Sequence, residues 1–192
     1  MRLERLEATQ RPEKLKAVFD GEALTVSASL CVQFSLCAGM ELDEEAFSAL
    51  KAAVAKEAAR ERAVRILTAS AVSERELEKR LLQKGMLPSD AADAVAWLKE
   101  HRFLDDAATA AQLVDSAVRK GYGRARVKNI LYEKGIPKDL WDEALARIPA
   151  MDDAIDRFLA AKLRGRTADE KTIKKTIDAL LRRGFSYGEI RD

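Results

Sequence analysis

Histidine and cysteine are scarce in this chain of 192 residues. It has a single histidine, His101, and two cysteines, Cys31 and Cys37, in an apolar stretch with no further cysteine or histidine beside them. A cysteine/histidine catalytic pair or a zinc site needs several such side chains in one place. We therefore interpret both cysteines as buried free thiols and His101 as a surface residue at a helix end, and we expect no catalysis, no metal and no cofactor.

Long apolar runs are absent as well. No stretch reaches the roughly 18 apolar residues that a membrane-spanning helix needs, and residues 1–5 lack the apolar core of a signal peptide. Linkers rich in glycine and serine are also absent. Because 47% of the residues are hydrophobic, the chain has ample material for a core. We expect a folded, cytoplasmic monomer without membrane contact.

Charge is nearly balanced over the whole chain, but it is not balanced along it. The formal net charge is +2. Residues 1–106 hold 16 lysines and arginines against 19 acids, whereas residues 107–192 hold 18 against 13. The C-terminal part is therefore the expected docking surface for a polyanion or for an acidic protein face.

A short pattern occurs three times: apolar, any residue, polar, basic, glycine, large apolar. Its glycines, Gly85, Gly135 and Gly184, are 50 and 49 residues apart. A second pair of landmarks, Leu-Asp-Asp at residues 104–106 and Met-Asp-Asp at residues 151–153, repeats after 47 residues. A period of about 45 to 50 residues is the length of a three-helix unit, which predicts tandem helical repeats.

The expected fold class is mainly α, with tandem three-helix repeats that form an elongated, curved body and a small N-terminal β-sheet as a cap. Neighbouring repeats would bury each other's apolar faces. The predicted divisions are residues 1–57 for the cap and a connecting helix, 58–103 for repeat one, 104–150 for repeat two and 151–192 for repeat three, whose last helix is cut short.

The cap should contain a hairpin. Asp20-Gly21 is a dipeptide favoured in two-residue type I′ turns, and it stands between two stretches with strand-like composition. Asp43 is a plausible N-cap for a long alanine-rich helix, for which a break near residues 55–58 is left open. The strands are expected at residues 2–10, 14–19 and 22–26, and the helices at 29–36 and 43–69.

Helix starts in the repeats carry recognisable caps. A serine or threonine followed three residues later by glutamate forms a capping box, Asp is a favoured N-cap, and Pro137 suits a first helical turn. The capping boxes are Ser73/Glu76, Thr167/Glu170 and Ser186/Glu189, and the N-caps are Asp105 and Asp152. The helices are expected at residues 73–84, 90–101, 106–120, 123–134, 137–147, 153–164 and 167–183, with a last one from 186.

Two motifs resemble sites of chemistry. The pairs Asp105/Asp106 and Asp152/Asp153 could hold a metal, but each precedes a helix, where an aspartate accepts hydrogen bonds from free amides, so we interpret them as caps. Residues 121–126 contain two glycines, yet they lack the third glycine of a dinucleotide motif and the Lys-Ser/Thr of a P-loop. We interpret this segment as a turn between helices.

Three-helix units also resemble the DNA-binding helix-turn-helix module. Repeat two offers Arg124, Arg126 and Asn129 near the start of its second helix for base contacts. Repeat one offers Glu74 and Glu76 there, and these acids would repel phosphate. Reading of a DNA sequence by all repeats alike is therefore not expected, although a DNA-binding helical-repeat module stays an alternative function.

Several spaced motifs together resemble the RecX family, bacterial regulatory proteins of the RecA recombinase. They follow the order shown by that family over about residues 58–190, and the N-terminal part is similar to the extension of its longer members. The motifs lie at residues 76–77, 81–85, 104–106, 118–124, 131–136 and 181–185, and those of the extension at 19–22 and 39–43.

The resemblance implies an inhibitor without chemistry of its own. Such a protein lodges in the groove of the RecA filament on single-stranded DNA and blocks strand exchange and co-protease activity, which modulates homologous recombination, DNA repair and the SOS response. Cations of repeats two and three would face acidic protein or phosphate. The expected contact residues are Arg119, Lys120, Arg124, Arg126, Lys128, Arg164, Arg166, Lys174, Lys175, Arg182 and Arg183. A helical scaffold for another protein, which needs no basic surface, stays a further alternative.

Overall fold

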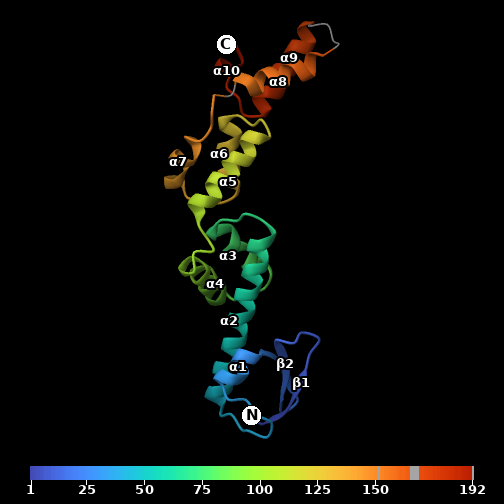
Figure 1. Cartoon of the computed structure of the whole chain (residues 1–192), viewed down its shortest axis with the longest axis vertical. Coiled ribbons are helices and arrows are strands. Elements are labelled where there is room, and N and C mark those ends of the chain that lie inside the picture. The colour runs from blue at the N-terminus through green and yellow to red at the C-terminus, as the bar shows by residue number, and fades with distance from the viewer. Residues whose placement is uncertain (151, 165–168, 192) are drawn as a thin grey trace. The chain divides into compact units, whose positions relative to one another are not determined.

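The computed structural model describes residues 1–150, 152–164 and 169–191. The chain divides into two compact units, whose elements are labelled in Figure 1. One unit contains Met1–Arg65 and Arg80–Trp97, and the other contains Ile66–Lys79 and Leu98–Asp192. The prediction of a mainly helical chain with a small N-terminal sheet is confirmed.

The N-terminal sheet has three antiparallel strands in the order β1-β2-β3. Asp20 and Gly21 join β2 to β3 with φ angles of +41° and +86°, the left-handed values that a type I′ turn requires at both central residues. The predicted hairpin is therefore confirmed. The strands are β1 (Leu3–Ala8), β2 (Lys14–Phe19) and β3 (Glu22–Ser27).

Two helices follow the sheet. Ser27 caps α1 (Ala28–Gln33) by accepting a hydrogen bond from the Leu30 amide. Asp43 caps α2 (Glu44–Ala69) through a 2.7 Å bond from the Ala46 amide to Oδ1, as predicted. The helix is continuous through residues 55–58, where Ala-Lys-Glu-Ala offers only strong helix formers, so no break occurs there.

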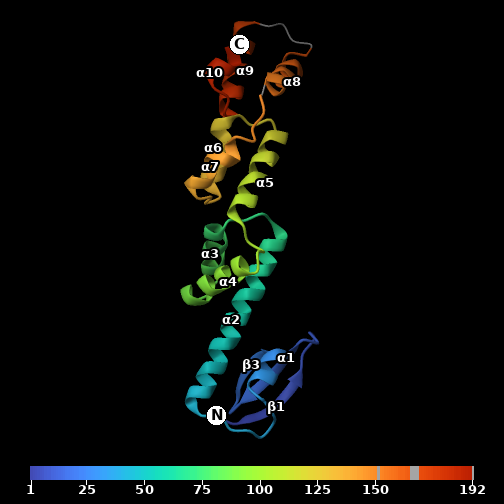
Figure 2. The ribbon, with the colours of Figure 1, turned by 60° about the vertical axis from the view of Figure 1, so that its left-hand side comes forward.

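The core of the N-terminal unit lies between the sheet and the first half of α2 (Figure 2). Phe19 from β2 and Phe47 from α2 meet with ring centroids 5.0 Å apart, and Leu3 and Leu50 are fully buried around them. Cys31 is only partly buried and Cys37 is exposed. The prediction of two buried thiols is therefore wrong, because Cys37 belongs to the turn after α1 and not to the core.

The first pair of repeat helices is α3 (Glu74–Gln83) and α4 (Pro88–Glu100). Ser73 accepts a 3.1 Å hydrogen bond from the Glu76 amide, which confirms Ser73 as the cap of α3. Helix α4 packs against α2 through Asp93, whose carboxylate lies 2.8 Å from Arg60 and 2.6 Å from Lys56.

Repeat two consists of α5 (Asp106–Arg119), α6 (Arg124–Glu133), a 3₁₀ turn (Lys138–Leu140) and α7 (Trp141–Leu145). Val114, Val127, Leu131 and Leu145 are fully buried between them. The helix expected over residues 137–147 is shorter and starts as a 3₁₀ turn. The reason is that Pro137 has an extended ψ of 140° and so precedes the helix instead of joining its first turn.

The last three helices are α8 (Asp152–Leu163), α9 (Glu170–Arg182) and α10 (Tyr187–Arg191). Asp152, predicted as an N-cap, is the first residue of α8. Helix α9 starts after Asp169, whose side chain accepts from the Thr172 amide; Thr167, the predicted cap, lies outside the described residues. The capping box of Ser186 and Glu189 is confirmed by bonds in both directions, of 2.6 and 3.3 Å.

Candidate protein and nucleic-acid interface

The end of α9 joins the start of α6 through backbone hydrogen bonds. The amide of Gly123 donates to the carbonyl of Arg183 at 2.9 Å, and the amide of Ala125 donates to the carbonyl of Gly184 at 3.1 Å. Gly184 has a φ of +90°, and a Cβ atom there would lie 2.2 Å from the backbone nitrogen of Arg126. Only glycine fits this position, which sets the contact between repeats two and three.

A related contact joins the end of α6 to the start of α3. The hydroxyl of Ser73 donates a 2.5 Å hydrogen bond to the carbonyl of Lys134, and a Cβ atom on Gly135 would lie 3.3 Å from that hydroxyl oxygen. Gly85, the glycine of the first copy of the pattern, has nothing within 4 Å of the same position. The repeated glycine therefore ends a helix in all three copies and contacts a preceding repeat in two of them.

Two adjacent aspartates cap two different helices. Asp105 accepts from the amides of Ala107 and Ala108 at 2.8 and 3.0 Å and caps α5. Asp106 accepts at 2.9 Å from the amide of Glu74, the first residue of α3. Burial raises the pKa of the Asp106 carboxyl above its ordinary value, although the bond from the Glu74 amide opposes this. The interpretation of Asp105 as a cap is confirmed, and Asp106 acts across the repeats.

The predicted contact residues of repeat two lie at the end of α5, directly after it, and in the first two turns of α6. Arg119, Lys120, Arg124 and Lys128 are exposed, and Arg126 is partly buried. Arg124 also donates to the carbonyl of Leu145 at 3.4 Å, and Arg126 lies 3.4 Å from Glu133. Part of the donor capacity of these two arginines is therefore used within the repeat.

In repeat three, Arg183 differs from the other predicted contact residues. Its guanidinium donates to the carbonyls of Lys120 and Gly121 at 3.1 and 3.4 Å. It also lies over the rings of Phe158 and Tyr122, at 4.7 and 6.0 Å from their centroids. Arg183 therefore fastens repeat three to the turn before α6. The sequence suggested only a free cation here, because its aromatic and carbonyl partners are distant in the chain.

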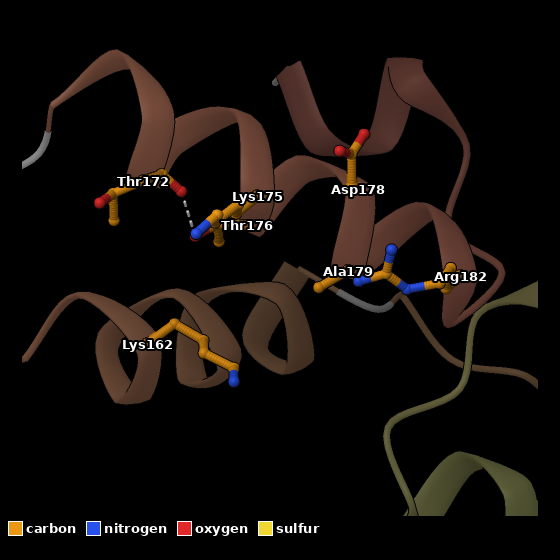
Figure 3. Close-up of a pocket in the computed structure, with 7 residues that line it drawn as sticks. All are labelled: Lys162, Thr172, Lys175, Thr176, Asp178, Ala179 and Arg182. Carbon is orange, nitrogen blue, oxygen red and sulfur yellow. Dashed lines mark hydrogen bonds between the residues drawn. The ribbon is translucent and has the colours of Figure 1, made fainter.

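The other predicted cations of repeat three are exposed. Arg164, Lys174, Lys175 and Arg182 have exposed side chains, and Arg166 lies outside the described residues. Lys175 and Arg182 line a cavity of about 440 Å³ between α8 and α9, which we call the α8/α9 recess. Figure 3 shows the lining, which consists of Lys162, Thr172, Lys175, Thr176, Asp178, Ala179 and Arg182.

Lys162 was missed by the sequence prediction, although a signal was present. Residues 155, 158, 159 and 162 share one face of a helix, and the first three pack into the core of repeat three. The face that carries Lys162 must therefore turn towards α9. The number of charges along the chain does not depend on the helix face that carries Lys162, so it could not reveal this residue.

Other kinds of site find no support in the part of the chain that is described. There, no group of three or more histidine, cysteine, aspartate or glutamate side chains is arranged to hold a metal ion. Within the same residues, no helix is long and apolar enough to cross a membrane.

Comparison with known proteins identifies the family. Family models described as the first and second three-helix domains of RecX match residues 59–98 and 105–145. The chain is 34% identical to the regulatory protein RecX of Cronobacter sakazakii over 146 residues, which covers 68% of this chain and 87% of that protein. The chain belongs to the RecX family. A regulatory protein RecX of Escherichia coli O1:K1 / APEC is 33% identical and is likewise covered over 87% of its length, with 69% of this chain.

Solved RecX structures share the fold. A crystal structure of regulatory protein RecX matches with a TM-score of 0.73 at 23% identity, over 100% of this chain and 98% of the other. RecX from Lactobacillus salivarius matches with a TM-score of 0.62 at 19% identity, over 72% of this chain and 94% of the other. The resemblance stated from the spaced motifs is therefore confirmed at the level of family and fold.

Proposed function

We propose that this RecX family member binds the RecA filament on single-stranded DNA and inhibits the recombinase and co-protease activities of RecA. It would thereby modulate homologous recombination, DNA repair and the SOS response. The chain acts by binding alone in this proposal and performs no reaction. Its relatives are named regulatory proteins, which supports a regulatory role.

The observation that carries the proposal is the junction between α6 and α9. Backbone bonds from Gly123 and Ala125 hold the start of α6 against the end of α9. Arg124 and Arg182, which are 58 positions apart in the sequence, each adjoin a residue of this junction. Exposed cations from two repeats are thus held close together on a fixed backbone, and such a basic surface suits an extended partner that is acidic or rich in phosphate.

The test is RecA-dependent ATP hydrolysis and strand exchange on single-stranded DNA with the purified chain in excess. We expect both activities to fall with the natural chain and to recover with the variant Arg124→Glu/Lys128→Glu, which reverses two exposed cations of α6. The variant Arg11→Glu/Lys16→Glu makes the same change of charge at the N-terminal sheet, in the turn before β2 and on β2, where both side chains are exposed, and it should still inhibit.

Three results would count against the proposal. Unchanged RecA activity with the natural chain in excess would rule out inhibition. Equal recovery with both double variants would mean that net charge alone is responsible. Tight binding to one DNA sequence without any effect on RecA would instead favour the DNA-binding module.

A further inference from the structure

The α8/α9 recess gathers more positive than negative charge. Lys162 comes from α8, and Lys175 and Arg182 come from α9 (Figure 3). Among the described residues, Asp178 is the only carboxylate in the lining. No carboxylate of the described residues lies within ion-pair distance of any of these three cations, whereas many other cations of the chain have such a partner. Like charges in one recess repel one another, and a bound anion would reduce that repulsion.

The positions of the cations follow from the helices. Thr172, Lys175, Thr176 and Arg182 recur at three-, four- and seven-residue spacing and share one side of α9. Lys175 and Arg182 are seven residues apart, so they are separated by about 10 Å along the helix axis at 1.5 Å per residue. A ligand that carries anionic groups over a comparable length can therefore meet both.

The chemistry of the lining favours phosphate groups over a protein partner. Protein interfaces depend on aromatic or aliphatic anchors in pockets, but Ala179 supplies the only apolar side chain among the described residues of the lining. Ammonium, guanidinium and hydroxyl groups are, in contrast, the usual contacts of backbone phosphates. The guanidinium of Arg182 offers a planar fork of donors to such a phosphate. The hydroxyl of Thr176, in contrast, donates its proton within α9, in a 2.8 Å bond to the Thr172 carbonyl.

We infer that the α8/α9 recess binds the phosphodiester backbone of DNA, with Lys162, Lys175 and Arg182 as the contacting cations. The inference goes beyond the proposed function, because it assigns a ligand to one site and concerns the chain without RecA. The inference also gives the cations of repeats two and three different roles. Arg124 and Arg126 of repeat two spend donors on Leu145 and Glu133. In the recess, Lys162 lies 5.9 Å from the centroid of the Phe158 ring, and Lys175 contributes to the lowered pKa of Asp169, but no cation of the recess has a carboxylate of the described residues within ion-pair distance. Because contacts to phosphates carry no direct sequence information, binding should not depend on the DNA sequence.

The test is fluorescence anisotropy of a labelled oligothymidylate with the full chain, without RecA, over a range of salt concentrations. The variant Lys175→Gln/Arg182→Gln should bind at least about tenfold more weakly, and its log–log salt slope should fall by about 1.4, since each lost phosphate contact on a single strand changes the slope by about 0.7. Lys162→Gln should act in the same direction from the other helix. Circular dichroism of each variant would show that it remains folded.

Lys171→Gln is the matched control. Lys171 is an exposed cation of α9 that does not line the recess, so this variant makes the same chemical change on the same helix. Its salt slope should stay at the value of the natural chain. Equal losses in Lys171→Gln and in the recess variants would overturn the inference, because the binding would then follow total charge and not the recess.

Further measurements distinguish a DNA backbone from a free phosphate, and they distinguish this inference from the proposed function. Thymidine monophosphate that competes as well as the oligonucleotide would point to a free-phosphate site and overturn the backbone assignment. Recess variants that bind DNA normally but no longer inhibit RecA would also overturn it, since the recess would then be a protein contact, while the proposed function would stand. DNA binding through the recess with no effect on RecA would support the recess and refute the proposed function.

Discussion

The main-chain amide of Gly123 donates a 2.9 Å hydrogen bond to the carbonyl oxygen of Arg183, sixty positions later in the chain. This bond joins the start of α6 to the end of α9, and the bond from Ser73 to Lys134 joins the start of α3 to the end of α6. A helix is partially positive at its amide end and partially negative at its carbonyl end. Each contact therefore brings complementary helix ends together. The residues at which α3, α6 and α9 start and end thus fix how the repeats meet.

Gly184→Ala should be strongly destabilising. The new Cβ would lie 2.2 Å from the backbone nitrogen of Arg126, and the φ of +90° is itself strained for alanine. We expect the free energy of unfolding to fall by more than about 3 kcal/mol. Urea denaturation followed by circular dichroism measures this loss.

Gly85→Ala separates the two causes. Gly85 has a comparable φ of +80° but nothing within 4 Å of the Cβ position, so this variant should lose only about 1 kcal/mol from backbone strain. If both variants lost the same amount, the close contact with Arg126 would add nothing, and the account of the junction would be wrong.

Arg183→Met should also destabilise the chain, because it keeps much of the apolar stem and removes the guanidinium. Two hydrogen bonds to the carbonyls of Lys120 and Gly121 and the contact with Phe158 would be lost. About 1 to 3 kcal/mol is expected in a denaturation experiment. Arg182→Met changes an exposed neighbour of the same type and should stay within about 0.5 kcal/mol of the natural chain. A larger effect at Arg182 than at Arg183 would contradict the roles given to them.

The repeated glycines made the order of the helices predictable, because the rule behind them is local. A helix that ends in a left-handed residue needs glycine at that place whatever its neighbours are, and the φ angles of Gly85, Gly135 and Gly184 are all positive. Asp43 and Ser73 were predictable as caps for the same reason, since a cap bonds to amides two or three residues away.

The contacts between repeats were not predictable from one sequence. Asp106 looked like part of the cap of α5, but its partner is the Glu74 amide, 32 residues earlier. Arg183 and Arg182 are chemically identical and adjacent, yet only Arg183 is held by Tyr122 and Phe158. Which of two cations faces a neighbouring repeat depends on the angle between helices, and residue spacing within one helix does not determine that angle.

Asp106→Asn tests the effect of burying a carboxyl group. Because burial raises the Asp106 pKa, the folded state favours the protonated form. The contribution of this group to stability is therefore full below the ordinary pKa and is lost as pH rises through the raised one. Asparagine keeps an oxygen for the Glu74 amide and carries no charge. The stability of the natural chain relative to Asp106→Asn should fall as pH rises from the acid range to neutrality.

Urea denaturation of both proteins at acid and neutral pH measures this difference. Asp106→Ala removes the acceptor as well, so it should be less stable than Asp106→Asn by about 0.5 to 2 kcal/mol at every pH, as the loss of a helix cap predicts. A stability difference between the natural chain and Asp106→Asn that grows in favour of the natural chain with rising pH would show that the carboxylate stabilises the contact, against this prediction.

Ser73→Ala should cost more than the loss of an ordinary helix cap. The Ser73 hydroxyl accepts from the Glu76 amide and donates to the Lys134 carbonyl, and the residue is fully buried. Alanine removes both bonds and leaves a carbonyl without this donor, for a total of about 2 to 3 kcal/mol. Asp169→Ala is the comparison, since Asp169 is exposed and caps only its own helix; about 1 kcal/mol is expected there. The excess loss at Ser73 measures what the contact between α3 and α6 adds, and Ser73→Thr, which keeps the hydroxyl, should recover most of it.

Equal losses at Ser73 and Asp169 would mean that the bond to Lys134 forms without stabilising the chain. The meeting of complementary helix ends would then be a result of how the repeats pack and not a cause of it.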